Sequence, residues 1–390
     1  MPAVSPTILN SLPELTALRH DFHAHPELGL EETRTSDIVA RQLEAMGYKV
    51  TRGLAKTGVV ATLTNGPGRR SIGIRADIDA LPILEETGLP YASKTPGLMH
   101  ACGHDGHTTM LLGAAKALAE RRNFDGTIHL IFQPAEENFG GAKIMIEEGL
   151  FDKFPCDAVF ALHNEPGIPF GKFAFREGPI MAAVDEAIIK VNGYGGHGSE
   201  PEKTSDPIFA GAAIVMALQS IISRNVPTLD PAVVTVAAFH GGSASNIIPS
   251  TAEIVVGIRT FSPHIRDEIE RRIKLIAAHQ AESFGMTASV DYQRSYDPTI
   301  NHAAETQFVR NLALKFAGAE NIIDMQRPQM GSEDFGYMLV ERPGSYFFLG
   351  GAKGEGDYSL HHPSYNFNDD LIPIGAAFWT ELAETYLKPE

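Results

Sequence analysis

The sequence is poor in cysteine and tryptophan and has no excess of positive charge. It holds 2 Cys and 1 Trp in 390 residues, and 32 Lys and Arg against 48 Asp and Glu give a net charge of −16. Two cysteines exclude the disulfide framework of a small secreted protein. The acidic balance makes nucleic acid and anionic membrane surfaces unsuitable partners. A chain of this length can bury a large core without cross-links.

Long apolar runs are missing as well. We find no run that approaches the roughly 20 apolar residues needed to cross a bilayer. Residues 1–32 contain no basic segment followed by an apolar one, so we expect no signal peptide. The 43% hydrophobic and 21% charged content is typical of a globular protein. We therefore expect a cytoplasmic protein with neither a membrane nor a nucleic-acid partner.

Predicted strands and helices alternate at both ends of the chain. These segments are at 8–20, 31–47, 57–63, 71–76, 107–121, 127–132, 141–148 and 157–162, and again at 303–317, 332–341, 345–349 and 371–387. Such alternation predicts an α/β fold in which a mixed sheet is flanked by helices.

The middle of the chain has a different pattern. Strand and helix signals follow one another at 184–193, 206–224, 231–240, 250–261, 263–284 and 286–293. This order, β-α-β-β-α-β, is a split βαβ unit that can fold alone. We predict a smaller inserted α+β domain at 185–296. The main domain would then be made of 1–184 and 297–390, with hinges near 183–185 and 296–300.

The densest group of metal-binding side chains is the segment 99–107, Met-His-Ala-Cys-Gly-His-Asp-Gly-His. It contains Cys102, one of only two cysteines, together with His104 and two more histidines. Thiolate and neutral imidazole are good ligands for zinc and its neighbours. The alternative is a buried cysteine beside a surface histidine, so a metal site requires further ligands elsewhere.

Further candidate ligands follow three predicted strands directly. They are Asp77 and Asp79, Glu136 and Glu137, and His163. In open α/β sheets, ligands bind beyond the carboxyl ends of the strands, so these groups converge if the strands are neighbours. Taken singly, each has a plainer interpretation as a loop histidine or a solvated acidic turn.

The pair Glu136-Glu137 suits metal-assisted hydrolysis. On an extended segment, adjacent side chains point to opposite sides, so one carboxylate can bind metal while the other faces a water. This chemistry needs a ligand that holds the ion and a free base that takes the proton of the water. His361 and His362 are a further pair from which a missing ligand could come.

Seven segments of the chain resemble the M20 metallopeptidases. These segments are 75–82, 100–107, 132–137, 195–199, 246–249, 331–335 and 360–363. They occur in the order of the family and span nearly the whole chain. The branch they resemble most is that of the amidohydrolases: hippurate hydrolases, N-acyl-amino-acid amidohydrolases and auxin-conjugate hydrolases.

The resemblance implies two divalent metal ions per subunit, with Zn, Mn, Co or Ni all suited to the mixed S, N and O ligands. Cys102 would bridge the ions, and His104, Glu137, His163 and His361 would complete the ligand set.

The first motif departs from that of other M20 branches, which carry a His-x-Asp there. In this chain the motif reads Ala-x-x-Asp from Ala76 to Asp79, so that histidine is absent. His104 would therefore take over the ligand role, and Asp79 would orient an imidazole rather than bind metal.

The resemblance also implies roles for residues away from the metals. Glu136 matches the general base, and His197 would reach the active site of the partner subunit in a dimer to stabilise the oxyanion. The alternative is that His197 is an ordinary histidine of a β-turn. Asn246 and Arg259 are candidates for substrate binding, since a guanidinium can hold a carboxylate through two bonds. Arg259 could instead pair with Glu253.

The implied activity is hydrolysis of the amide bond of N-acyl or N-aroyl amino acids such as hippurate. The protein would be a homodimer or a larger homo-oligomer, with the inserted domain as its lid and dimerisation domain. A deacetylase of N-acetyl-diaminopimelate and a dipeptidase are alternatives on the same fold. More distant ones are a thiol-dependent amidase that uses Cys102 and a non-catalytic binding protein.

Overall fold

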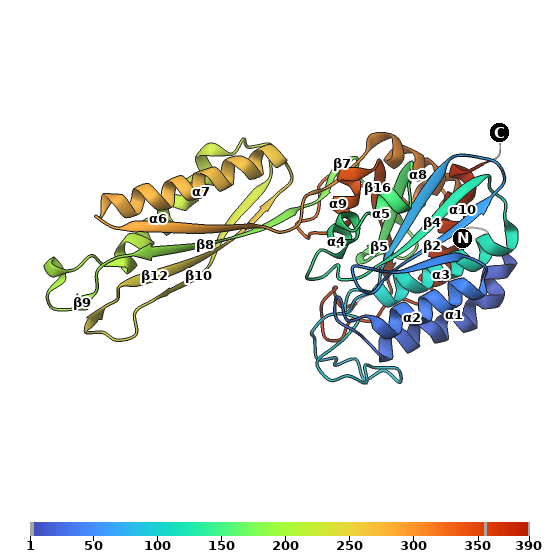
Figure 1. Ribbon diagram of the computed structural model, residues 1–390, viewed down its shortest axis with the longest axis horizontal. Helices are drawn as coiled ribbons and strands as arrows, with labels where there is room; N and C mark the ends of the chain where they lie inside the picture. Colours follow the sequence, from blue (N-terminus) through green and yellow to red (C-terminus); the bar gives the residue numbers. More distant parts are fainter. Residues whose placement is uncertain (1–3, 355–356, 389–390) are drawn as a thin grey trace. The chain divides into compact units, whose positions relative to one another are not determined.

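The computed structural model describes residues 4–354 and 357–388, which form two compact units (Figure 1). The first unit comprises Met1–Ile180, Ile300–Arg327 and Asp334–Glu390, and the second comprises Met181–Thr299 and Pro328–Glu333. The second unit is therefore inserted into the chain of the first. Each unit has a buried apolar cluster of its own.

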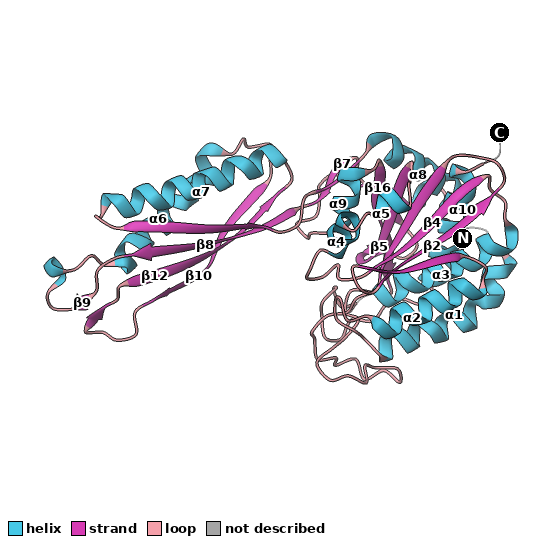
Figure 2. Ribbon diagram, in the orientation of Figure 1, coloured by secondary structure: helices cyan, strands magenta, loops and turns pink. Residues whose placement is uncertain are grey.

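The first unit is built around a mixed sheet of eight strands (Figure 2), in the order β1-β2-β4-β3-β5-β16-β6-β15. These strands are β1 (Lys49–Leu54), β2 (Gly58–Asn65), β3 (Ser71–Asp77), β4 (Gly126–Gln133), β5 (Ala158–Pro169), β6 (Phe173–Phe175), β15 (Ile322–Asp324) and β16 (Gly344–Ala352). This mixed sheet is flanked by helices, which confirms the predicted fold class.

Four neighbouring strands, β4, β3, β5 and β16, run parallel. β3, β4 and β16 are buried along almost their whole length and β5 is buried from Ala158 to Asn164, as expected of central strands that are covered on both faces. The register pairs Asp77 with Gln133, and it pairs Arg75 with Ala161, two residues before His163. Asp77, Gln133 and His163 therefore lie close together toward the carboxyl ends of the parallel strands, where polar strand-end residues were predicted to meet. We call this side of the sheet its polar edge.

Two groups of helices cover this sheet (Figure 1). The larger group shares the main apolar cluster and consists of α1 (Pro6–Ala24), α2 (Thr33–Ala45), α3 (His104–Arg121), α8 (Ala303–Ala317) and α10 (Leu371–Tyr386). The smaller group contacts β4, β5 and β16 and consists of α4 (Gly141–Glu147), α5 (Leu150–Lys153) and α9 (Phe335–Glu341). Connecting loops lie at the edge of the sheet that carries the polar strand-end residues.

The second unit has the predicted order β-α-β-β-α-β. Its main elements are β8 (Ala183–Asn192), α6 (Pro207–Ser220), β10 (Ala232–Gly241), β12 (Thr251–Thr260), α7 (Pro263–Ser283) and β13 (Thr287–Arg294). The strands form an antiparallel sheet in the order β10-β12-β8-β13. Burial alternates along β8 and β12, so one face of the sheet packs on α6 and α7.

The helical stretch Pro207–Asn225 corrects the expectation that no apolar run is long enough to cross a membrane. It has 19 residues and a mean hydropathy of 1.5, which meets that test by length and composition. Its buried residues Ala210, Ile214 and Leu218 belong to the apolar cluster of the second unit. This packing is the ordinary role of an apolar helix in a protein core, so the stretch is weak evidence for a membrane span.

Short strands are the main elements that the sequence patterns did not predict. Besides β1, β6 and β15, they are β7 (Gly178–Met181), β9 (Gly196–His197), β11 (Ile247–Ile248) and β14 (Thr299–Asn301). The edge strand β1 is mostly exposed or half-buried, so its sequence has no apolar alternation to detect. The predicted helix 332–341 begins later, at Phe335.

Candidate metal centre

The loop before α3 places Cys102 and His104 at the polar edge of the sheet. Between them, Gly103 adopts a φ of 94°. A Cβ atom at this position would lie 2.2 Å from Oδ1 of Asn164. Glycine alone tolerates both this φ and this approach. The sequence Cys-Gly-His therefore allows a thiol and an imidazole to lie directly against β5.

The structure brings the five predicted metal ligands together. Sγ of Cys102 lies 3.3 Å from Nε2 of His163. Nε2 of His361 lies 3.3 Å from Oε1 of Glu137. Nε2 of His104 lies 3.9 Å from the same oxygen. One sulfur, three imidazole nitrogens and a carboxylate thus face one another, which is a donor set suited to a transition metal or zinc.

His361 and not His362 reaches this group. The carbonyl of Ala101 accepts a hydrogen bond of 2.8 Å from the backbone N–H of His361, which holds that residue beside the Cys102 loop. The ring of His362 instead stacks on Tyr358, and its Nδ1 accepts from the backbone N–H of Ser364 at 3.0 Å. The choice between the two histidines, which the sequence left to resemblance, thus agrees with the geometry.

Hydrogen bonds at Nδ1 orient two of the imidazoles as ligands. Nδ1 of His104 lies 3.0 and 3.1 Å from two oxygens of Asp79, and Nδ1 of His163 lies 2.7 Å from the carbonyl of Asn164. These oxygens are acceptors, so each Nδ1 donates, and in the neutral ring each Nε2 keeps its lone pair for a cation. Nε2 of His104 is buried with no hydrogen-bond partner. Buried nitrogen without a partner is uncommon in proteins, and a cation would satisfy it.

Asp79 occupies the orienting position that the sequence analysis assigned to it. Its Oδ1 accepts from His104, and its Oδ2 accepts from the backbone N–H of Glu137 at 2.9 Å. The side chain is buried, with 1% exposed. Asp79 therefore fixes one imidazole and one carboxylate of the group at the same time.

The charged and ionisable groups of the site favour the binding of a cation. Burial raises the pKa of Cys102 well above its usual value, and the carboxylates of Glu137 and Glu136 raise it further. Burial by itself would lower the pKa of His104, but Asp77 and Asp79 outweigh it and raise the pKa to about 10. The protein alone thus keeps the thiol neutral, whereas a bound divalent ion would stabilise the thiolate.

Glu136 and Glu137 lie in a turn, which corrects the expectation of an extended segment. The turn follows β4, and Ala135 adopts a left-handed φ of 56°. The two side chains do not diverge to separate sides, because ligand atoms of Glu136, Glu137 and His104 all lie within 4.8 Å of one another. The carboxylate of Glu136 therefore lies beside that of Glu137, the predicted ligand.

His107 and Asn164, which are buried behind the candidate ligands, were not predicted as part of the site, whereas Asp77 beside them was a candidate ligand. His107 lies between Asp77 and Asn164, with Nδ1 2.6 Å from Oδ1 of Asp77 and Nε2 2.6 Å from Oδ1 of Asn164. Both its nitrogens are thus occupied, so His107 supports the ligands rather than joining them. Asp77 also accepts from Arg75 at 2.7 Å. The signal for Asp77 was its place after a strand, whereas Asn164 had only its position after His163.

Three predicted residues lie in the second unit. His197 is exposed on β9, where its Nδ1 accepts from the backbone N–H of Ser199 at 3.1 Å. Asn246 is exposed beside it, and its carbonyl accepts from the backbone N–H of Gly198 at 2.8 Å. Arg259 is half-buried on β12, with its guanidinium 3.1 Å from the carbonyl of Ile258.

The alternative pairing of Arg259 with Glu253 is wrong. Both residues lie on β12, six positions apart, and the part of the chain that the structure describes shows no ion pair between them. Burial lowers the pKa of Arg259, and Asp185 partly opposes this shift. The guanidinium thus remains a candidate for binding an anionic group.

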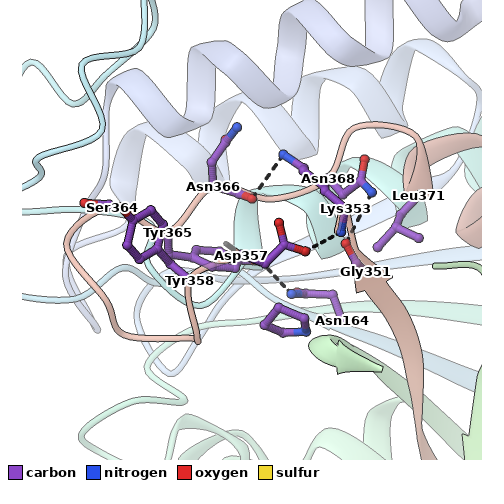
Figure 3. Close-up of a pocket in the computed structure, with 11 residues that line it drawn as sticks. Asn164, Gly351, Lys353, Asp357, Tyr358, Ser364, Tyr365, Asn366, Asn368 and Leu371 are labelled. Carbon is purple, nitrogen blue, oxygen red and sulfur yellow. Dashed lines mark hydrogen bonds between the residues drawn. The ribbon is translucent and has the colours of Figure 1, made fainter. Parts of the chain in front are cut away.

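A cavity of about 220 Å³ is lined mainly by polar residue types (Figure 3). Its lining residues are Asn164, Pro166, Gly351, Lys353, Asp357, Tyr358, Ser364, Tyr365, Asn366, Asn368 and Leu371. Asn164 links the cavity to the site, because its Nδ2 donates to the hydroxyl of Tyr365 at 2.6 Å and its backbone follows His163. The cavity gives a small polar molecule room close to the candidate metal centre.

Comparison with known proteins identifies relatives along nearly the whole chain. The model of peptidase family M20/M25/M40 matches residues 73–385. A hippurate hydrolase of Campylobacter jejuni is 45% identical over 386 residues, which cover 98% of this chain and 99% of the relative. An N-acetyl-L-cysteine deacetylase of Bacillus subtilis is 40% identical over 375 residues, which cover 96% and 88%.

Solved structures show the same fold. A dinuclear metal binding peptidase of the M20 family from Bacillus subtilis superposes with a TM-score of 0.85 at 32% identity. The match covers 97% of this chain and 99% of that one.

Proposed function

Because this chain belongs to peptidase family M20/M25/M40, we propose that it hydrolyses the amide bond of N-acyl or N-aroyl amino acids. The observation that carries the proposal is the convergence of one thiol, three imidazoles and a carboxylate beside the second carboxylate, that of Glu136. The similarity to a hippurate hydrolase and to an N-acetyl-L-cysteine deacetylase supports the substrate class.

The proposed ligand set would hold two divalent ions, with Cys102 as the ligand common to both and His104, Glu137, His163 and His361 as the other protein ligands. When bound, such ions polarise an amide carbonyl and lower the pKa of a water from 15.7 to roughly 7. The donor set suits Zn, Mn, Co and Ni.

Glu136 is the proposed general base. It takes the proton of the attacking water and then returns it to the nitrogen of the leaving amino acid. Its carboxylate lies within 4.8 Å of ligand atoms of His104 and Glu137. The Asp79 side chain holds the backbone of Glu137 by a bond of 2.9 Å, which keeps the ligand and the base in one geometry.

The second unit is proposed to complete the site from a neighbouring subunit of a homodimer or larger homo-oligomer. Since Nδ1 of His197 accepts from a backbone N–H, the neutral ring carries its hydrogen on Nε2 and can donate it to an oxyanion. Asn246 and Arg259 are proposed to bind the substrate, with Arg259 on its carboxylate. In this proposal 185–296 form the lid and dimerisation domain of a cytoplasmic enzyme, and 1–184 with 297–390 form the catalytic domain.

His197→Ala is expected to lower kcat by about 10²–10³-fold, as measured when a single oxyanion donor is removed from other enzymes. Elemental analysis should find an unchanged metal content, because His197 is not among the proposed ligands. His279→Ala, an exposed histidine of α7 in the same unit, is the matched control and should keep full activity. Loss of metal from His197→Ala would contradict the oxyanion role.

A substrate panel with chelation and metal restoration tests the proposed function. Hippurate, N-acetyl amino acids, N-acetyl-diaminopimelate and dipeptides are incubated with the enzyme, and release of the free amino acid is measured. We expect turnover of N-acyl or N-aroyl amino acids that a chelator abolishes and Mn, Co, Ni or Zn restores. Preference for N-acetyl-diaminopimelate or dipeptides would favour those alternatives. Turnover that chelation leaves unchanged would favour a thiol-dependent amidase.

A further inference from the structure

The backbone just before the proposed base is held in an unfavourable conformation. Ala135 has a φ of 56° and is fully buried. Residues with a side chain rarely adopt this left-handed region, and they remain there only when the surrounding structure imposes it. Since Ala135 is bonded directly to Glu136, whatever imposes this conformation also sets the direction in which the base leaves the backbone.

Three contacts enclose Ala135. Its backbone N–H donates to Oε1 of Glu32 at 2.8 Å, and its carbonyl accepts from the backbone N–H of Gly141 at 3.0 Å. On its Cβ side is Gly29, where an added Cβ atom would lie 2.9 Å from both Cα and Cβ of Ala135. Of these three contacts, only the hydrogen bond to the Glu32 side chain can be removed by a substitution that leaves the backbone unchanged.

Glu32 is itself fixed and buried. It lies just before α2 with 0% of its surface exposed, and its Oε2 accepts from the hydroxyl of Thr57 at 2.6 Å. Burial raises the pKa of Glu32 to about 7 and the Asp79 carboxylate adds to the rise, while the bonds from Thr57 and Ala135 oppose it. Among residues 4–354 and 357–388 it forms no ion pair. A buried carboxyl without a cationic partner is costly to keep, which points to a positional role.

We propose that Glu32 is a positioning residue for Glu136: its carboxylate holds the Ala135 N–H, fixes the left-handed turn and thereby aims the general base. The inference rests on the proposed function for the role of Glu136. Glu32 acts through Ala135 and does not itself touch the candidate ligands. A hydrogen bond from a backbone N–H to a carboxylate is shorter and stronger than one to a neutral acceptor, so it can hold a strained residue that an apolar side chain could not.

The test compares Glu32→Ala and Glu32→Gln with Glu27→Ala. Glu32→Ala removes the acceptor and should lower kcat by about 10–100-fold with KM within about twofold, because misplacing a catalytic group by 1 Å can cost about 10² in rate. Glu32→Gln keeps an oxygen for the Ala135 N–H and should stay within about threefold of the wild type in kcat. Both variants should keep their full metal content.

Glu27→Ala is the matched control. Glu27 lies on the same segment and also accepts backbone N–H bonds, from Arg34 and Thr35 at 2.8 Å each, but they belong to α2. Its loss should lower the melting temperature and leave kcat unchanged. An equal fall of kcat in Glu27→Ala, a kcat in Glu32→Ala within about threefold of the wild type, or a loss of metal in proportion to activity would overturn the proposal.

Hydrogen exchange of the segment 133–140 gives a readout that needs no substrate. In Glu32→Ala the amide of Ala135 should exchange faster than in the wild type, whereas Glu27→Ala and Glu32→Gln should leave it protected. Failure of the wild type to cleave any N-acyl amino acid would refute the proposed function, and the exchange result would still decide whether Glu32 holds the turn.

If Glu32→Ala does not fold, Thr57 offers a milder test. Thr57→Val removes one of the two donors that fix the carboxyl and should lower kcat by about threefold to tenfold, while Thr57→Ser, which keeps the hydroxyl, should not. Equal activity of the valine and serine variants would overturn the proposal.

Discussion

Glu136→Gln is expected to lower kcat by about 10²–10⁴-fold, the contribution of a positioned general base. The amide has nearly the shape of the carboxylate but cannot take the proton of a water. Because Glu136 is the proposed base and not one of the proposed ligands, the variant should keep its metal. Activity on hippurate and elemental analysis of the same preparation measure both quantities.

Its neighbour provides the internal comparison for this experiment. Glu137→Gln should lose metal as well as activity, since Oε1 of Glu137 lies within 3.9 Å of two imidazole nitrogens. Glu147→Gln, on the exposed side of α4, should change neither. Normal turnover by Glu136→Gln would refute the base assignment, and loss of metal from it would show that both carboxylates are ligands.

Cys102→Ala should lose most of its bound metal and, with it, at least about 100-fold in activity. Removing even an outer partner of a metal ligand costs 10–100-fold in affinity, and Cys102 is proposed to bridge both ions. Elemental analysis after purification without chelator, followed by the hippurate assay with and without added metal, measures the two losses.

Cys156→Ala is the matched control, because Cys156 is also buried but its Sγ faces the carbonyl of Phe154 at 3.4 Å. That variant should keep its metal and its activity. Full metal content with no activity in Cys102→Ala would identify the thiol as a nucleophile. Full metal content with normal activity would remove Cys102 from the site.

Strand-end positions were the most informative part of the sequence for the site. Asp79 and Glu137 follow buried strands and His163 lies near the end of the buried part of β5, and parallel pairing of these strands brings the three residues to one side of the sheet. Cys102 and His104 join them because Gly103 permits the tight turn before α3. Residue types and spacing thus predicted which side chains gather, and resemblance selected His361.

The environment of each ligand could not be predicted in the same way. That Asp79 fixes His104 and that Asp77 and Asn164 occupy His107 depends on side chains 25 to 57 positions apart that meet only after the sheet has formed. No periodic pattern records such contacts. The same holds for Ala135, whose left-handed conformation contradicts its own preference and is imposed by Glu32, 103 positions away.

By itself, the sequence determined the fold class, the order of elements in both units and the chemical kinds of ligand, because these follow from apolar periodicity and from residue type. Only the tertiary structure decided which nitrogen of each histidine faces the site, that Glu136 and Glu137 share one turn, and that a buried carboxyl from the start of α2 holds that turn. These features depend on distances between atoms of segments that lie far apart in the sequence. Packing of the whole unit sets such distances to within tenths of an ångström.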